Sequence, residues 1–344
     1  CRVSIAVPKN IAFQGVQDLE GKRIATSYPN TVNCFLEANQ IKADLHIING
    51  SVEIAPNIGL ADAICDIVSS GSTLFKNNLL LFFWDIINLR VKDYDLVIND
   101  FEPISAWSCK LKRVPCFGIS NQLSLLKKGI PKPKKKFKST IRFLKFFAPV
   151  KIGYGLHYQK FSEKIYHPII RTKVKKLITS EGKGIVVYLP AYNEKSILEI
   201  TNKLPHRQWH IFSRNISHKK AIGSSHLYPI HEDVFLELLS GADGVIASGG
   251  FTTTAESLFL NKPLLVIPMK GHIEQIYNAV SLDSMGVKVL ERFSLKQLDE
   301  IKSWLNYPKR IKINFENDSG KLIDQIAIDF IKMKLDQDLI TKTT

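Results

Sequence analysis

Short runs of apolar and β-branched residues recur along the chain, and amphipathic stretches with helical spacing lie between several of them. The expected helices include residues 194–203, 232–239 and 274–285. Strands that alternate with helices form βαβ units, in which crossover helices join parallel strands. The pattern therefore predicts an α/β chain with parallel sheets. Its expected strands are Val3–Val7, Arg23–Ser27, Leu45–Ile48, Ala63–Val68, Leu96–Ile98, Pro115–Ile119, Gly184–Leu189, Trp209–Ser213, Gly244–Ala247 and Pro263–Pro268.

The composition is that of a globular protein with more than one domain. A length of 344 residues predicts two domains, and 45% hydrophobic with 23% charged residues excludes disordered, collagen-like and disulfide-scaffold classes. The five cysteines are few, odd in number and confined to the first 116 residues, which favours reduced thiols in a cytoplasmic protein. Because the first residue is Cys1, we expect a processed chain or a piece of a longer one.

A soluble or membrane-peripheral protein is expected from the distribution of apolar residues. The most apolar segment, Leu79–Ile87, contains Asp85 and is shorter than the ~20 residues that a spanning helix needs. The opening residues do not have the pattern of a signal peptide. We therefore expect a cytoplasmic location, with a peripheral position at the inner membrane face as an option.

Positive charge is concentrated in one part of the chain. The net charge is +15, and residues 81–150 carry 14 Lys/Arg against 5 Asp/Glu. The run from Lys127 to Lys145 has nine basic residues and no acidic one. It is either a solvated loop or an amphipathic segment that binds an anionic membrane surface or a lipid acceptor. Nucleic acid is a less favoured partner, because the sequence has no recognised nucleic-acid-binding module. Apolar residues interleaved with this charge include Phe137, Phe143, Leu144, Phe146 and Phe147.

The loop after the expected strand Ala63–Val68 reads Ser69-Ser70-Gly71-Ser72-Thr73. Hydroxyl groups and backbone N–H groups around a glycine can converge on an anion such as phosphate. A capped turn that binds no ligand is the alternative interpretation.

The surrounding stretch, GSVEIAPNIGLADAICDIVSSGSTL at 50–74, resembles ATP phosphoribosyltransferase, the first enzyme of histidine biosynthesis, as does GKRIATSYPNTVNCFLE at 21–37. The resemblance covers residues 1–78, and the family's other domain has no counterpart in this chain. It implies that the segment binds the ribose and 5′-phosphate of phosphoribosyl pyrophosphate, with Mg²⁺ required for that reaction only. The residues it implicates are Asp66, Ser70, Gly71, Ser72 and Thr73.

A second motif, ADGVIASGGFTTTAESLFLNKPLLVIPMKGHIEQIYNA, occupies residues 242–279 and predicts strand, tight turn, helix, strand, loop and helix. The N-terminus of its first helix can receive a diphosphate, and Glu256 in the first turns can accept hydrogen bonds from a ribose diol. Gln275 and Asn278 are three residues apart, so their amides share one helix face. The alternatives are a carboxylate favoured by the helix dipole and a solvated polar face. Their joint position after consecutive parallel strands favours a ligand site.

These residues resemble the GT-B glycosyltransferases that include the peptidoglycan N-acetylglucosaminyltransferase, and the likeness extends over about residues 80–335 through DYDLVINDFEPISAWSCKLKRVPCFGISNQ at 93–122. The resemblance implies a UDP-type sugar donor and no cofactor. In it Glu256 holds the ribose, Gly249–Thr254 hold the diphosphate, and Gln275 and Asn278 hold the sugar. The implicated residues are Ser248, Gly249, Gly250, Thr252, Thr253, Thr254, Glu256, Gln275 and Asn278.

The chain departs from this family at the acceptor side. The family's Gly-rich acceptor loop is missing, and the phosphoribosyltransferase-like segment stands in its place. Asp100 and Glu102 follow a strand and are candidate acceptor-side carboxylates, with loop capping as the alternative. The histidines show no metal-ligand spacing, so no metal site is expected, and His157 is expected to be structural.

Taken together, the sequence predicts a GT-B-like pair of Rossmann-like domains, the first incomplete and preceded by a small phosphoribosyltransferase-like α/β domain. The expected boundaries are 1–78, 79–150, 151–335 and a tail at 336–344. The expected function is transfer of a sugar from a nucleotide-diphosphate donor to a hydroxyl acceptor, for which a lipid is one candidate. The missing acceptor loop argues against turnover by this chain. The alternatives are an ATP phosphoribosyltransferase fragment and a non-catalytic fusion that binds nucleotide sugar.

Overall fold

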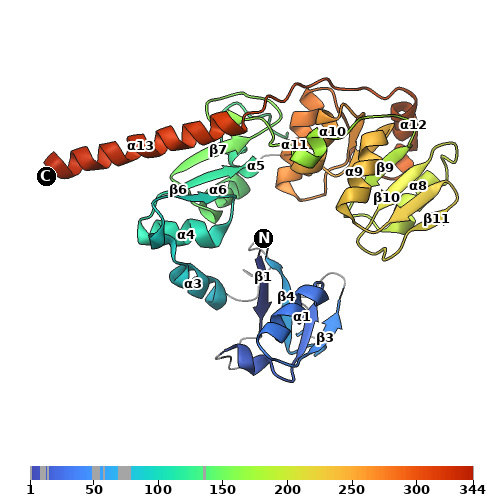
Figure 1. Ribbon diagram of the computed structural model, residues 1–344. Coiled ribbons are helices and arrows are strands. Elements are labelled where there is room, and N and C mark those ends of the chain that lie inside the picture. Colours follow the sequence, from blue (N-terminus) through green and yellow to red (C-terminus); the bar gives the residue numbers. More distant parts are fainter. Residues whose placement is uncertain are drawn as a thin grey trace. The chain divides into compact units, whose positions relative to one another are not determined.

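The chain divides into two compact units, Cys1–Cys116 and Phe117–Thr344. The computed structural model (Figure 1) describes residues 2–7, 13, 15–48, 55–56, 59–68, 79–134 and 137–343. The division after Cys116 lies between the boundaries expected near 78 and 150, which stay predictions together with the one at 335. Each unit is described by itself.

The first unit contains a four-stranded sheet of order β1-β4-β2-β3. β2 pairs in parallel with β3 and β4, as the alternating pattern predicts, whereas β1 is antiparallel to β4. β1 lies at the edge, a common position for an antiparallel strand in a mixed sheet. The elements are β1 (Arg2–Ala6), β2 (Arg23–Thr26), α1 (Pro29–Ala38), β3 (Asp44–Ile47) and β4 (Ala63–Val68), with a 3-10 turn at Val16–Leu19.

The remainder of this unit consists of α3 (Leu79–Asn88), a 3-10 turn at Val91–Asp93, β5 (Val97–Asn99) and α4 (Pro103–Lys112). The most apolar segment of the sequence thus forms the ten-residue helix α3. Within the described ranges, no helix has both the length and the apolar character needed to cross a bilayer.

The second unit begins with a parallel arrangement of β6 (Cys116–Ser120), β7 (Ile152–Leu156) and β8 (Ile165–Tyr166). Two helices, α5 (Asn121–Ser124) and α6 (Lys138–Phe147), lie between β6 and β7 in the chain. Part of the basic run is therefore helical. One side of α6 packs through Ile141 and Leu144 near Tyr277, while Phe143 and Phe146 are exposed.

The larger sheet of this unit has seven strands in the order β11-β12-β10-β9-β13-β14-β15. All neighbours pair in parallel except β11, which is antiparallel to β12 at the edge. The strands are β9 (Ile185–Tyr188), β10 (Trp209–Phe212), β11 (Lys220–Ile222), β12 (Ser225–Tyr228), β13 (Gly244–Ala247), β14 (Leu264–Val266) and β15 (Lys288–Val289). The helices are α7 (Thr172–Lys175), α8 (Glu194–Thr201), α9 (Glu232–Gly241), α10 (Phe251–Phe259), α11 (Ile273–Ser284) and α12 (Leu298–Asn306), with a 3-10 turn at Leu295–Gln297.

Helices cover both faces of this sheet because alternate strand residues point to opposite sides. Val245 packs in a core with α9, α10 and α11, and its neighbour Ile246 packs in the other core with α8 and α12. Continuous apolar strands are therefore buried on both faces. The arrangement brings the carboxyl end of β13, a central strand, to the start of α10.

The final helix, α13 (Ser319–Thr343), was not among the expected elements. Leu322, Ile326 and Met333 are buried. Asp329 accepts a hydrogen bond of 2.8 Å from the Tyr154 hydroxyl in β7 and lies 2.6 Å from Lys164 Nζ. The helix thus contacts β7 and the segment before β8, and from there it extends away through the residues expected to form a tail (Figure 1).

Candidate functional site

The glycine loop, Ser248-Gly249-Gly250, connects β13 to α10 as the sequence predicts. A Cβ atom at Gly249 would lie 2.6 Å from the carbonyl oxygen of Gln275, so only glycine allows this approach of the loop to α11. Gly250 is the N-cap of α10, and no described side chain caps this helix. The first N–H groups of α10 are therefore donors at the positive end of a helix dipole.

The three threonines at the start of α10 have different surroundings. Thr252 is exposed and Thr253 is partly exposed, whereas Thr254 is fully buried. The Thr254 hydroxyl donates to the carbonyl oxygen of Gly250 at 2.8 Å. The Tyr158 hydroxyl lies 2.6 Å from the same Thr254 hydroxyl. Thr254 thus stabilises the glycine loop through a buried hydrogen bond. The hydroxyls of Thr252 and Thr253 are accessible to a ligand.

Glu256 is 2% exposed and forms a bidentate ion pair with Arg171. Arg171 Nε lies 2.6 Å from Oε1, and Nη2 lies 2.7 Å from Oε2. The hydrogen bonds to Glu256 raise the pKa of the Arg171 guanidinium, and the negative charges of Glu256 and Glu232 raise it further. The sequence did not indicate Arg171, because it lies 85 residues before its partner and in no motif that we considered.

Gln275 and Asn278 share one face of α11, as their spacing predicts, and both are buried. The Gln275 side-chain oxygen accepts from the Met269 N–H at 2.9 Å, and Asn278 Nδ2 donates to the Gly249 carbonyl at 3.0 Å. Both amides therefore brace neighbouring loops. Asn278 Oδ1 is buried with no hydrogen-bond partner in the described part of the chain.

The acceptor-side candidates lie in the first unit. Glu102 is the N-cap of α4, and its carboxylate accepts from the Ile104 N–H at 2.7 Å and the Ser105 N–H at 2.8 Å. This is the capping alternative considered for Glu102. Asp100 is exposed directly after β5.

The phosphoribosyl candidates lie largely outside the described residues. Asp66 is in β4, where its backbone pairs with Ser4 of β1. Ser70, Gly71, Ser72 and Thr73 fall in the range 69–78, which the structure does not describe.

A cluster that the sequence spacing did not reveal brings together His167, Glu316 and Asp318, with ligand-type atoms within 4.8 Å of one another. Their partner is a lysine: Lys160 Nζ lies 3.0 Å from a carboxylate oxygen of each acid. The ammonium group supplies the positive charge that a metal ion would bring, so the cluster is an ion-pair network. His157 is buried, with Nε2 3.0 Å from the Ser281 hydroxyl, which agrees with the structural role expected for it.

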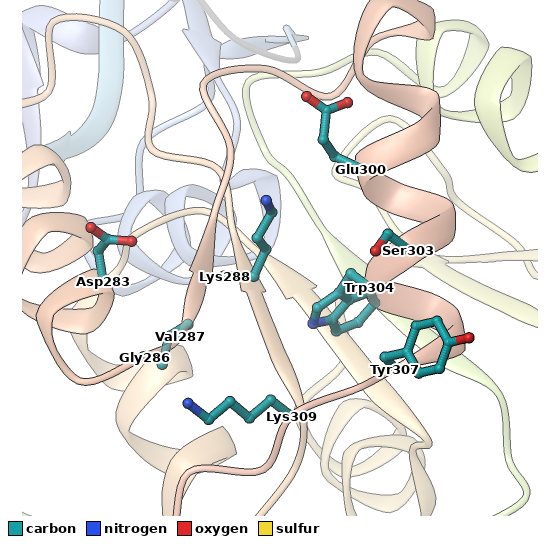
Figure 2. A pocket seen from close by; sticks show the side chains of 9 residues that line it. All are labelled: Asp283, Gly286, Val287, Lys288, Glu300, Ser303, Trp304, Tyr307 and Lys309. Atoms are coloured by element: carbon teal, nitrogen blue, oxygen red, sulfur yellow. The ribbon is translucent and has the colours of Figure 1, made fainter.

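A surface pocket of about 360 Å³ lies between the end of α11, the start of β15 and the end of α12 (Figure 2). Trp304 and Tyr307 form one side of it, and Figure 2 shows the amines of Lys288 and Lys309 on the other. It borders the start of β15, whereas the glycine loop follows the end of β13, so the two lie at opposite ends of these parallel strands.

Two family models match different parts of the chain. The ATP phosphoribosyltransferase model matches residues 1–91, and the model described as Glycosyl transferase family 1 matches residues 85–307. The ATP phosphoribosyltransferase of Cytophaga hutchinsonii is 66% identical over 79 residues, which make up 23% of this chain and 28% of that protein. The enzyme of Parabacteroides distasonis is 62% identical over the same shares. The chain thus spans about 28% of the length of these curated relatives.

Solved structures also resemble the two parts. The ATP phosphoribosyl transferase (HisG:HisZ) complex from Thermotoga maritima is 38% identical, covers 22% of this chain and 36% of that one, and has a TM-score of 0.20. The glycotransferase of kitacinnamycin is 14% identical over 83% of this chain and 90% of that one, with a TM-score of 0.46. MurG of Acinetobacter baumannii is 13% identical over 83% and 91%, with a TM-score of 0.42.

These TM-scores are low, so the assignment depends on the family models, which agree with the predicted fusion of a phosphoribosyltransferase-like segment and a GT-B-like α/β part. The Glycosyl transferase family 1 match includes the glycine loop, Glu256, Gln275 and Asn278. It covers well over half of the sequence. The chain belongs to Glycosyl transferase family 1.

Proposed function

We propose that the protein transfers a sugar from a nucleotide-diphosphate donor of the UDP type to a hydroxyl acceptor. The observation that carries this proposal is the uncapped N-terminus of α10, which follows the glycine loop at the carboxyl end of a central parallel strand. Ligands of open parallel sheets bind outside the carboxyl ends of the strands, and helix N-termini favour phosphate groups there.

In such a transfer, negative charge grows on the nucleoside diphosphate as its bond to the sugar breaks. Backbone N–H groups that already point at the diphosphate stabilise this charge without reorganising during the reaction. We assign this role to the glycine loop and to the first residues of α10, with the Thr252 and Thr253 hydroxyls as further donors. Donor binding of this kind is metal-independent.

Glu256 is assigned to the ribose diol and the α11 amides to the donor sugar. Gln275 already contacts Met269 through both Oε1 and Nε2, and Asn278 contacts Gly249 through Nδ2. Sugar contacts would therefore use the donor and acceptor positions that these amides have left. The partnerless Asn278 Oδ1 supports this assignment, because a buried acceptor without a donor is costly. We assign no general base, since the Glu102 carboxylate is engaged in its helix cap.

A lipid acceptor or an anionic membrane surface suits helix α6. Phe143 and Phe146 are 49% and 55% exposed, next to the exposed basic residues Arg142 and Lys145. Exposed aromatic rings beside basic side chains favour the interface of an anionic bilayer. We propose that α6 holds the protein peripherally at such a surface.

A second candidate function is favoured by the similarity of a 79-residue stretch to ATP phosphoribosyltransferases, whose family model matches residues 1–91. Binding of phosphoribosyl pyrophosphate with Mg²⁺ through Asp66 and Ser70–Thr73 would follow from it. Because the match spans about 28% of those relatives' length, we propose ligand binding rather than phosphoribosyl transfer for this segment.

Thermal unfolding in the presence of each ligand, combined with a transfer assay, tests these functions. We expect UDP to raise the melting temperature of the wild type but not of Glu256→Ala. Stabilisation by Mg²⁺ and phosphoribosyl pyrophosphate, lost in Thr73→Ala, would support the second candidate. UDP binding without hydrolysis or transfer of any UDP-sugar would indicate a non-catalytic nucleotide-sugar-binding fusion, and no stabilisation by either ligand would refute both sites.

A further inference from the structure

The Arg171 guanidinium joins two carboxylates of different exposure. Nε and Nη2 bind the two oxygens of Glu256, which is 2% exposed, while Nη1 lies 2.5 Å from Oε1 of Glu232, which is 48% exposed. Glu256 is in α10, Glu232 begins α9, and Arg171 directly precedes α7. Three separate elements therefore meet at one guanidinium.

Pairing with Arg171 determines how the Glu256 carboxylate is oriented. A buried carboxylate without a partner is costly, and a planar guanidinium that binds both oxygens fixes the plane of the carboxylate as well as its charge. A carboxylate has about four acceptor positions, so the pair leaves about one on each oxygen. At 2% exposure only the rim of Glu256 is accessible, and the orientation of its plane decides whether a diol can reach those positions.

We infer that Arg171 is a positioning residue that makes the nucleotide site selective for a ribose with both of its hydroxyls. This inference rests on the proposed function, in which Glu256 accepts hydrogen bonds from the ribose diol. Arg171 acts through Glu256, and Glu232 holds the outer edge of the same guanidinium. Loss of the two-point contact leaves the Glu256 carboxylate free to rotate, and the hydroxyl preference is lost with it.

Titration calorimetry with UDP and 2′-deoxy-UDP separates this role from a merely structural one. The wild type is expected to bind UDP about tenfold or more tightly than 2′-deoxy-UDP, because a hydrogen bond to a charged group contributes about 1.5–3 kcal/mol. In Arg171→Lys and Arg171→Gln we expect this ratio to fall to about threefold or less. A general loss of protein stability would weaken the binding of both nucleotides equally and leave the ratio of their affinities unchanged.

Lys173→Gln is the matched control, because in the described part of the chain Lys173 pairs with Glu232 and Asp233 and not with Glu256. It should keep the wild-type ratio. The inference would be overturned if both Arg171 variants kept the wild-type discrimination. It would also be overturned if they bound UDP more tightly, because Arg171 would then block access of the ribose to Glu256. A wild type that binds neither nucleotide would overturn the proposed function itself.

Discussion

His157 is a buried imidazole that connects two segments of the second unit. Its Nε2 atom lies 3.0 Å from the Ser281 hydroxyl in α11, and its ring stands edge-on to Phe161 at 4.9 Å. Burial lowers the pKa of His157 to about 4, because the charged imidazolium loses its hydration there. The folded state therefore favours the neutral form of this imidazole.

The first prediction follows from this pKa. An unfolded histidine has a pKa near 6.5, so the unfolded chain binds more protons between about pH 4 and 6.5, and stability falls as the pH is lowered through that range. The loss amounts to at most about 3 kcal/mol for this residue. In His157→Gln, urea unfolding measured across this range should depend less on pH than in the wild type.

The exposed His206 provides the control for that measurement. His206→Gln should retain the wild-type pH dependence. If His157→Gln retained it as well, the imidazole would not be the group that titrates.

Residue identity alone reveals only part of the site. Gly249 could be predicted, because two glycines directly after an apolar strand indicate a tight turn next to a helix start. The pairing of Arg171 with Glu256 could not, because it joins positions 85 residues apart that only the folded sheet brings together. The same holds for Lys160 and its partners Glu316 and Asp318.

At the scale of elements, the approach of the glycine loop to α11 leads to the second prediction. In Gly249→Ala, the new Cβ would lie 2.6 Å from the Gln275 carbonyl oxygen, a backbone atom that moves only with the helix. We expect a loss of roughly 1–3 kcal/mol in the free energy of unfolding, as for other overpacked sites, together with weaker UDP binding. Chemical denaturation measures the first effect and calorimetry the second.

Gly250→Ala is the matched stability control, since a Cβ atom there would have nothing within 4 Å. Its stability should change by less than that of Gly249→Ala. Equal losses for the two variants would mean that the loop does not depend on close contact with α11.

The third prediction concerns helix α6. Its inner side packs near Tyr277, whereas Phe143 and Phe146 are exposed beside basic residues. The double variant Phe143→Ser/Phe146→Ser should bind vesicles of phosphatidylserine and phosphatidylcholine about tenfold more weakly, since two apolar side chains no longer enter the interface. Co-sedimentation with the vesicles measures this binding.

Ile178 is 89% exposed at a different surface position and serves as the control. Ile178→Ser should bind the vesicles like the wild type. A double variant with undiminished binding would show that α6 is not the membrane contact.

The elements differ in how well the sequence predicts them, for a physical reason. β9, β13 and β14 are buried on both faces, so each appears as an uninterrupted apolar run. β12 reads SHLY and the edge strand β11 reads KAI, and neither forms such a run. α13 was missed because its apolar residues cover more than one side, with Ile323, Ile331 and Leu335 exposed.

At the scale of the whole molecule, the two compact units have separate cores, and the division after Cys116 falls inside the glycosyltransferase match at 85–307. The core around Ile24, Val32 and Leu36 belongs to the first unit, and the cores on the two faces of the seven-stranded sheet belong to the second. The chain therefore combines a phosphoribosyltransferase-like segment with a glycosyltransferase-family part. The proposed nucleotide site depends on residues of the second unit alone.

At this scale, we expect the second unit to bind a nucleoside diphosphate through the glycine loop and Glu256. Titration of UDP into the full chain tests this in the wild type, in Glu256→Ala and in the control Glu237→Gln, whose exposed carboxylate in α9 pairs with Lys183. We predict saturable binding to the wild type, a loss of about tenfold or more in Glu256→Ala, and near wild-type affinity in Glu237→Gln. A wild type that does not bind UDP at millimolar concentration, or a Glu256→Ala variant with undiminished affinity, would contradict the claim.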